Sequence, residues 1–240
     1  MPRYRSPKLY TDLASWFHLL TSPDDYAGET EFIRETLSSA SPVPIHELLD
    51  LGSGGGNNAF HLKSRFRLTL MDIAPAMIET SRAINPECEH FVGDMRSARL
   101  GRLFDAVLVH DAIMYMTTPQ EMLECMTTAR AHTRPGGVAL FLPDLTRETF
   151  AEGVHHGGRD SGARSLRYIE WTFDPDPADT SYTVDFAILA RENRGPARVT
   201  HDQHVFGLFS RKEWMDLLRQ AGFEPQLIKD PYEREVFLGR

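Results

Sequence analysis

The chain has few cysteines, no long apolar run and a deficit of positive charge. Its 240 residues contain two cysteines, Cys88 and Cys125, too few for a disulfide framework or a cysteine-based metal site. No apolar run is long enough for a membrane-spanning helix, and no apolar segment of the secretion-signal kind follows the first residues. We therefore expect a globular protein of the reducing cytoplasm, with no membrane partner and with both thiols as ordinary buried residues.

The charge balance bears on possible partners. Lys and Arg number 26 against 34 Asp and Glu, which gives a formal net charge of −8 at pH 7. Proteins that hold nucleic acids by their phosphates need a surplus of Lys and Arg, so DNA and RNA are not expected partners. A hydrophobic fraction of 41% is ordinary for a folded domain.

Short apolar segments alternate with helix-like segments in the first 145 residues. The first forty residues show helical spacing, and Pro42 and Pro44 end this region. Strands are then predicted at residues 45–51, 68–71, 90–92, 104–109 and 138–142, and helices from residue 57, at 77–84 and at 122–132. Such alternation predicts an α/β fold with a Rossmann-like parallel sheet covered by helices on both faces.

The pattern changes after the fifth predicted strand. Residues 167–173, 182–190 and 198–208 are predicted as strands that pair antiparallel, because no helix lies between them. Ser210 and Glu213 form a capping box that opens a helix ending near Gly222. Two short strands close the chain at residues 226–229 and 235–238, and we expect the last one to be antiparallel.

This organisation predicts one domain over residues 1–240 with four parts. They are an N-terminal helical cover (1–41), a ligand-binding core (42–145), an antiparallel insert (146–208), and a C-terminal helix with closing strands (209–240).

The most specific motif is the loop Gly52-Ser53-Gly54-Gly55-Gly56 after the first strand. A dinucleotide loop of the form G-x-G-x-x-G needs glycine at position 57, where this chain has Asn57. Asp50 brings a carboxylate towards the loop, which repels a pyrophosphate but attracts a sulfonium ligand with an ammonium group. The loop therefore favours S-adenosylmethionine (SAM) over a nicotinamide or flavin cofactor.

Polar residues follow the next strands at the edge where ligands bind in open α/β sheets. Asp72 stands twenty residues beyond Gly52, the spacing at which an acidic residue reaches ribose hydroxyls. Asp94 is placed to accept a hydrogen bond from the adenine amino group, with Met95 lining the ring. His110, Asp111 and Asp144 follow the fourth and fifth strands.

These segments resemble the motifs of class I SAM-dependent methyltransferases. The matching stretches are Leu48-Leu49-Asp50-Leu51-Gly52-Ser53-Gly54, Asp72, Gly93-Asp94-Met95 and Arg134-Pro135-Gly136-Gly137. Residues 93–97, 100–105 and 208–211 are further similar to the TDP-aminosugar N,N-dimethyltransferases of macrolide biosynthesis. The resemblance implies SAM-dependent methyl transfer to a nitrogen or oxygen of a small molecule. It also implies an insert that contributes to dimerisation and to the substrate site.

The resemblance implies a role for each matching residue. The methionine part of SAM would meet Gly52, Ser53, Gly54 and His110; the ribose would meet Asp72 and Ile73, with Met77 nearby; the adenine would meet Asp94, Met95 and Arg96. Tyr26 matches a tyrosine that reaches the cofactor carboxylate. Phe17 stands where the family has a tyrosine near the methyl group, and Tyr115 where it has a histidine near the acceptor amine.

Methyl transfer from a sulfonium is an in-line displacement, so the protein mainly aligns the reactants. An amine acceptor must be neutral to attack, whereas a hydroxyl acceptor benefits from a base. Asp111 and Tyr115 are the predicted catalytic residues, with His110 more on the cofactor side. The alternatives are a helix cap for Asp111 and a core aromatic for Tyr115. At the level of function, the alternatives are a non-catalytic SAM-binding or regulatory protein and a nicotinamide-dependent oxidoreductase.

Other histidines raise the question of a metal. His201, Asp202 and His204 lie on one predicted strand, but His201 and His204 point to opposite faces, so no metal site is predicted. His155 and His156 stand beside two glycines, and we interpret them as part of a mobile loop over the acceptor pocket.

Overall fold

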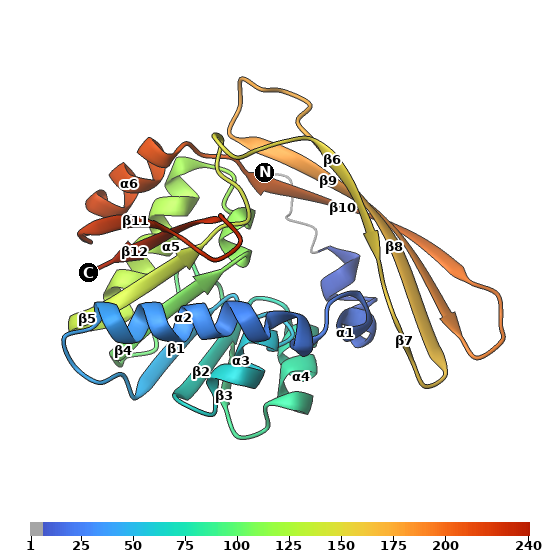
Figure 1. Ribbon diagram of the computed structural model, residues 1–240, viewed down its shortest axis with the longest axis horizontal. Helices are drawn as coiled ribbons and strands as arrows, with labels where there is room; N and C mark the ends of the chain where they lie inside the picture. Colours follow the sequence, from blue (N-terminus) through green and yellow to red (C-terminus); the bar gives the residue numbers. More distant parts are fainter. Residues whose placement is uncertain (1–6) are drawn as a thin grey trace.

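Two β-sheets organise the chain, and short N-terminal helices contact the second sheet and the helices that cover the larger one (Figure 1). The computed structural model describes residues 7–240. Residues 1–6 of the predicted helical cover lie outside the described residues. The larger sheet and its helices form the body on the left of Figure 1, and the second sheet extends away on the right.

The larger sheet has seven strands in the order β11-β12-β5-β4-β1-β2-β3. Its strands are β1 (Glu47–Leu51), β2 (Arg67–Asp72), β3 (Glu89–Val92), β4 (Phe104–His110), β5 (Thr133–Leu142), β11 (Pro225–Lys229) and β12 (Glu235–Gly239). The first five pair in parallel, and β12 pairs antiparallel with both β5 and β11. The predicted Rossmann-like α/β class, with its antiparallel last strand, is confirmed.

Helices cover both faces of this sheet because β1, β4 and β5 are apolar on both sides. The helices are α1 (Phe17–Leu20), α2 (Ala27–Ala40), α3 (Asn57–Leu62), α4 (Pro75–Ile84), α5 (Pro119–His132) and α6 (Arg211–Gln220). The α2 and α3 helices pack in one core with Leu48, and α5 and α6 pack in another with Leu49. No helix within residues 7–240 is long and apolar enough to cross a membrane.

The N-terminal cover differs from the predicted helices in one respect. Before α2 the described chain forms four short pieces: the 3₁₀ turns η1 (Lys8–Tyr10), η2 (Ala14–Trp16) and η3 (Pro23–Tyr26), and α1. Ser22 caps η3 in a capping box with Asp25, immediately before α2 begins. Leu9, Leu13 and Trp16 bury their side chains against the second sheet, which explains why the pieces stay folded.

The strand β5 begins earlier than the strand predicted at residues 138–142. β5 begins at Thr133, and its pairing with β4 shifts register between Phe104 and Ala106. Arg134 pairs with the buried carboxylate of Asp105 at 2.5 Å, which holds the irregular segment against the sheet.

The second sheet contains β10 (Arg198–Gly207), β9 (Ser181–Glu192), β8 (Arg164–Phe173) and β6 (Gly153–Gly157) in that order, with β7 (Asp160–Ser161) paired to β8. The predicted antiparallel pairing of the three long strands is confirmed. The interpretation of His155 and His156 as a mobile loop is wrong: both lie in β6, opposite Glu170 and Ile169 of β8.

Candidate active site

A cavity of about 1090 Å³ opens where the carboxyl ends of the parallel strands face the insert sheet. Its walls come from the glycine loop, the N-terminal cover, the turns after β4 and β5, and the inner face of β6, β8, β9 and β10. All fifteen predicted site residues line this cavity: Phe17, Tyr26, Asp50, Gly52, Ser53, Gly54, Asp72, Ile73, Met77, Asp94, Met95, Arg96, His110, Asp111 and Tyr115.

The glycine loop brings bare backbone to the cavity. Gly52 has a φ of +80°, and a Cβ there would lie 2.4 Å from the Cβ of Ala112, so only glycine fits. Gly54 has a φ of +52°, and a Cβ there would meet nothing within 4 Å. The space beside Gly54 is therefore open for a ligand that approaches the main chain.

Asp50 is a buried carboxylate behind this loop. Its side chain lines the cavity, and its Oδ1 has no hydrogen-bond partner among the described residues. Burial raises the pKa of Asp50 to about 7, against the lowering effect of nearby His110. An ammonium group of a ligand would supply the missing donor and return the carboxylate to its charged form.

Asp72, the last residue of β2, connects the glycine loop to the residue that precedes α4. Its Oδ2 accepts a hydrogen bond from the Gly54 amide and its Oδ1 one from the Ala74 amide, both at 2.8 Å. Ile73 beside it is 46% exposed although apolar, and Met77 is buried below. A flat ligand group resting on Ile73 would cover that apolar surface.

Asp94 and Arg96 form a pair on the far side of the glycine loop. The Arg96 guanidinium lies 2.7 Å from Asp94 and 2.8 Å from Glu121 of α5. Burial alone would raise the pKa of Asp94, but hydrogen bonds from Arg96 lower it below its ordinary value. Met95 lies beside this pair in the cavity wall.

His110 ends β4 in a buried network of charges. Its Nε2 lies 2.6 Å from Glu29 of α2, and its Nδ1 lies 3.1 Å from Asp111. Arg234, in the turn between β11 and β12, contacts Glu29 and also pairs with Asp230 at 3.0 Å. Burial lowers the pKa of His110, but Asp111 and Glu29 raise it more, to about 9. His110 therefore carries a positive charge near neutral pH.

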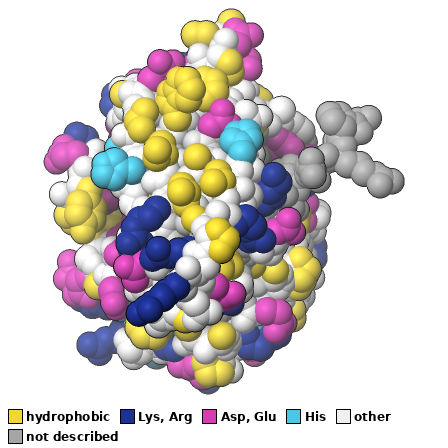
Figure 2. Space-filling view, turned by 90° about the vertical axis from the view of Figure 1, so that its right-hand side faces the viewer, with side chains coloured by type: hydrophobic (Ala, Val, Ile, Leu, Met, Phe, Trp, Pro, Cys, Tyr) yellow, Lys and Arg dark blue, Asp and Glu magenta, His cyan; other side chains and the backbone are white. Residues whose placement is uncertain are grey.

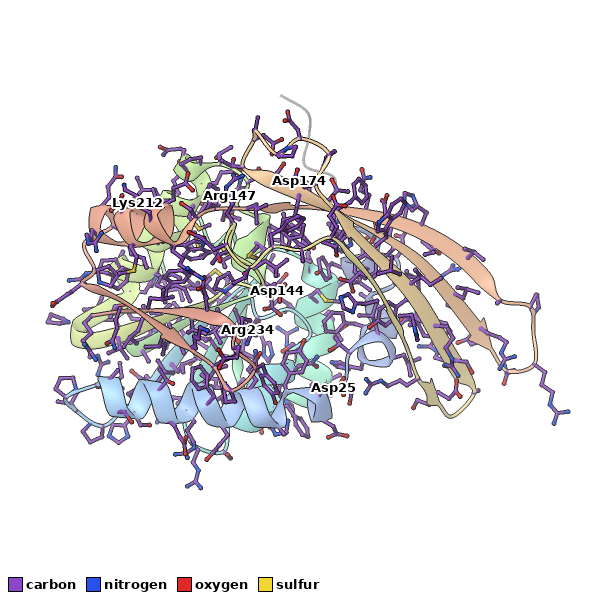
Figure 3. The ribbon with its side chains drawn as sticks, turned by 45° about the horizontal axis from the view of Figure 1, so that its top comes forward. Asp25, Asp144, Arg147, Asp174, Lys212 and Arg234 are labelled. Atoms are coloured by element: carbon purple, nitrogen blue, oxygen red, sulfur yellow. The ribbon has the colours of Figure 1, made fainter. Side chains whose placement is uncertain are left out.

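Asp111 begins the turn after β4 in an unusual conformation. Its φ of +26° is rare for a residue with a side chain and is held by a hydrogen bond from its amide to the Leu142 carbonyl. Burial and the nearby Asp144 raise its pKa, with His110 and Arg234 acting in the other direction. Figure 3 shows Asp144 beside Arg234 near the centre of the molecule, where their side chains approach to 4.0 Å.

Two aromatic residues of the cover reach the cofactor side of the cavity. The Tyr26 ring lies 6.0 Å from the His110 ring, and its hydroxyl oxygen accepts a hydrogen bond from the Thr21 hydroxyl. The Phe17 ring lies against Gly55, where an added Cβ would come within 2.5 Å of it. Both side chains thus close the glycine loop from above, although Phe17 brings no polar group.

Tyr115 sits on the opposite side, towards the insert. It ends the 3₁₀ turn η4 (Ala112–Tyr115), and its hydroxyl lies 3.0 Å from the Tyr10 hydroxyl and 2.7 Å from His204 Nδ1. His204 belongs to β10, where its Nε2 lies 3.2 Å from Asp202. These two β10 residues, considered above as possible metal ligands, therefore lie beside Tyr115, a contact that no sequence pattern indicated.

The insert wall adds aromatic and acidic groups to this end of the cavity. Tyr168, Glu170, Tyr182, Phe186 and Phe206 line it. Burial raises the pKa of Tyr182, and three nearby carboxylates, those of Asp144, Asp111 and Glu170, raise it further. This part of the cavity therefore combines aromatic walls with carboxyl groups, and burial raises the pKa of Glu170 among them.

Sequence reasoning missed Glu29, Arg234 and Glu170. Glu29 and Arg234 are separated by 205 residues and come into contact only in the folded chain, so no local sequence pattern indicated that they pair. The position of Glu170 could have been predicted, because side chains alternate along β8 and Glu170 therefore lies on the face opposite Ile169 and Trp171. Within the part of the chain that the structure describes, no cluster of three His, Cys, Asp or Glu side chains is arranged to hold a metal ion.

Comparison with known proteins agrees with this geometry. Residues 48–137 match the model of a family described as methyltransferase domain. The chain is 29% identical to the dTDP-3-amino-3,4,6-trideoxy-alpha-D-glucopyranose N,N-dimethyltransferase of Streptomyces venezuelae over 224 residues, which cover 90% of this chain and 91% of the relative.

Solved structures show the same likeness. Streptomyces venezuelae DesVI superposes with a TM-score of 0.85 at 25% identity, covering 96% of this chain and 97% of DesVI. CalS10, an amino pentose methyltransferase from Micromonospora echinaspora solved with bound SAM, superposes with a TM-score of 0.79 at 25% identity, covering 95% of this chain and 95% of CalS10. The similarity thus includes the insert sheet as well as the glycine loop.

Proposed function

We propose that this chain is a class I SAM-dependent methyltransferase and that its acceptor is the amino group of a deoxyamino sugar carried on a nucleotide. Relatives that cover about nine-tenths of the chain are named as N,N-dimethyltransferases of dTDP-linked amino sugars. The similarity over the insert residues supports the proposal most, because we assign the acceptor to the end of the cavity that the insert forms.

The observation that carries this proposal is the charge of that end of the cavity. Asp144 raises the pKa values of both Asp111 and Glu170, so these three carboxyl groups form one acidic cluster. An amino sugar arrives largely as an ammonium ion, which such a group attracts. The aromatic walls offer faces for the cation and for the apolar side of a deoxy sugar. Asp111 and Asp144 already lie near Arg234, at 3.6 and 4.0 Å, so Glu170 is the carboxylate that a cationic acceptor would compensate.

The described residues also fit SAM, which when bound supplies an electrophilic methyl group on a positively charged sulfur. We assign its ammonium group to Asp50, its methionine backbone to Gly52, Ser53, Gly54 and Tyr26, its ribose to Asp72 and Ile73, and its adenine to Asp94, Met95 and Arg96. Met77 supports the ribose side, while Phe17 and His110 flank the reacting end. The unpaired Oδ1 of Asp50 and the open space beside Gly54 support this placement.

Methyl transfer to paired acceptors tests the proposal. Purified protein is incubated with SAM and either a dTDP-linked deoxyamino sugar or its hydroxyl analogue, and the products are weighed by mass spectrometry. We expect one or two methyl groups on the amine and none on the hydroxyl analogue. Glu170→Gln should raise KM for the amine without changing the affinity for S-adenosylhomocysteine. Methylation of the hydroxyl analogue at a comparable rate would overturn the proposal.

We further propose that the enzyme is a cytoplasmic homodimer. Both cysteines are free thiols, Cys125 buried and Cys88 half-buried, as a reducing compartment would leave them. The outer face of the insert sheet exposes apolar side chains, among them Trp171 at 55% and Val199 at 66%. Figure 2 shows hydrophobic side chains gathered on this side of the molecule. An exposed apolar patch of this kind is typical of a protein–protein contact.

A further inference from the structure

Tyr115, His204 and Asp202 form an unbroken chain of polar contacts from the cavity into the insert sheet. The Tyr115 hydroxyl lines the cavity and lies 2.7 Å from His204 Nδ1. His204 Nε2 lies 3.2 Å from Asp202 Oδ2, and that oxygen also accepts a hydrogen bond from the Leu9 amide at 2.7 Å. The side chains of His204 and Asp202 are only 1% and 6% exposed. A buried imidazole thus contacts a phenol of the cavity wall and is itself held by a buried carboxylate.

The direction of these hydrogen bonds follows from the chemistry of the carboxylate. Burial alone would raise the pKa of Asp202, but hydrogen bonds from His204 and from the Leu9 amide lower it, so Asp202 is ionised and can only accept. His204 Nε2 must then carry the proton of the neutral ring, which leaves a lone pair on Nδ1. Tyr115 donates its one hydroxyl proton to that lone pair, so the Tyr10 hydroxyl, 3.0 Å away, donates to the Tyr115 oxygen. The second lone pair of that oxygen can accept a proton from the acceptor.

We propose that Tyr115, with His204 and Asp202 behind it, removes a proton from the acceptor ammonium so that the amine can attack the methyl group; this rests on the function proposed above. Tyr115 is the catalytic residue, because it faces the acceptor. His204 and Asp202 are positioning residues that act through it.

The proton step balances without any further reactant. One N–H bond of the ammonium breaks, and its electron pair stays on nitrogen as the nucleophilic lone pair. That proton moves to the Tyr115 oxygen while the phenolic proton moves to His204 Nδ1. The resulting imidazolium is stabilised by Asp202 through the Nε2 hydrogen bond. After the reaction, the proton returns to water along the same path.

The titratable groups that face His204 come from several elements. They are Asp202 from the same strand, Tyr115 from η4, Tyr10 from η1 and Glu170 from β8. Phe186 and Phe206 pack against the ring at centroid distances of 5.0 and 5.8 Å and exclude water from it. His201, on the opposite face of β10, pairs instead with Asp185 and is largely exposed.

The pH dependence of kcat/KM for the amine acceptor tests the relay. We expect Tyr115→Phe and His204→Gln to lower kcat/KM near neutral pH by about a hundredfold, within the range usual for proton transfer. The loss should shrink to a few-fold above the pKa of the free amine, where no proton has to be removed. Asp202→Asn should show the same trend with a smaller loss. His201→Gln, the matched control on the same strand, should behave like the wild type.

A loss that stays equal at every pH, or no loss in Tyr115→Phe, would overturn the relay while leaving amine methylation by the wild type intact. A second measurement does not depend on turnover. Nitrogen NMR of the labelled histidines should show His204 protonated on Nε2 and unprotonated on Nδ1, with the Nδ1 signal moved by Tyr115→Phe. The opposite tautomer would refute the relay, whereas failure to methylate any amine would refute the proposed function instead.

Discussion

At the scale of single residues, Asp72 shows how one carboxylate can organise a loop and still face a ligand. Its two oxygens hold the amides of Gly54 and Ala74, which ties the glycine loop to the start of α4. Each carboxylate oxygen has two lone pairs, so one hydrogen bond to each leaves capacity for ribose hydroxyls. Burial raises its pKa and the two amides lower it, so the side chain depends on these donors to remain charged.

Replacing Asp72 therefore tests the predicted ribose contact. We expect Asp72→Ala to weaken binding of S-adenosylhomocysteine at least about tenfold, equivalent to about 1.4 kcal/mol, measured by titration calorimetry. Asp12→Ala, at an exposed position of the N-terminal cover, serves as the control and should bind normally. An unchanged affinity in a folded Asp72→Ala protein would remove Asp72 from the ribose site.

At the scale of elements, one ion-pair network joins α2, the end of β4 and the β11–β12 turn. Glu29 contributes from α2, His110 from β4 and Arg234 from the turn. Burial raises the pKa of Glu29, but His110 and Arg234 lower it more, to about 2. Removing one member of a buried pair leaves the other charge uncompensated, so these three elements depend on each other for stability.

This network predicts a pH dependence of stability. The pKa of His110 is about 9 in the folded protein and 6.5 in the unfolded chain, so its contribution is fully present below pH 6.5 and is lost as the pH rises through about 9. We expect the free energy of unfolding to fall by roughly 1–3 kcal/mol over this interval, measured by urea denaturation. His110→Gln should abolish this part of the dependence, whereas His201→Gln should retain it. An equal slope in both variants would show that His110 does not titrate in this range.

At the scale of the whole molecule, the two faces of the insert sheet differ: one lines the cavity and the other is exposed. Glu170 and Tyr168 point into the cavity, whereas their neighbours Ile169 and Trp171 point outward. On the outer face, Val154 pairs with Trp171 across β6 and β8, and Leu189 pairs with Val199 across β9 and β10. The sheet can therefore join a second copy without changing its acceptor wall.

The proposed dimer predicts a selective effect of a charge on the outer face. We expect wild-type protein to have the mass of a dimer in light scattering coupled to size-exclusion chromatography. Trp171→Glu should shift it towards the monomer, because the carboxylate would be buried without a partner at the interface. Binding of S-adenosylhomocysteine should stay unchanged, since Trp171 faces away from the cavity. A wild type that runs as a monomer at working concentrations contradicts the dimer.

The sequence alone determined the order of the elements and the cofactor side of the site. The strand–helix alternation, the glycine loop and the acidic strand ends are local patterns, each fixed within a few residues by backbone and side-chain chemistry. The same local signals identified the Ser210 capping box, which the structure confirms. The edge strand β6 was missed because its glycines and histidines carry no strand pattern, and pairing with β8 alone orders it.

Only the tertiary structure decided which residues far apart in the sequence form hydrogen bonds and ion pairs with each other. Tyr115 and His204 are 89 residues apart, and Glu29 and Arg234 are 205 apart, yet each pair is in contact. Such contacts depend on how the insert and the closing hairpin pack onto the parallel sheet, which no local pattern specifies. From the sequence we could thus predict a cationic cofactor at the strand ends. The fold decided which residues surround the acceptor, because hydrogen bonds and charges act through space and not along the chain.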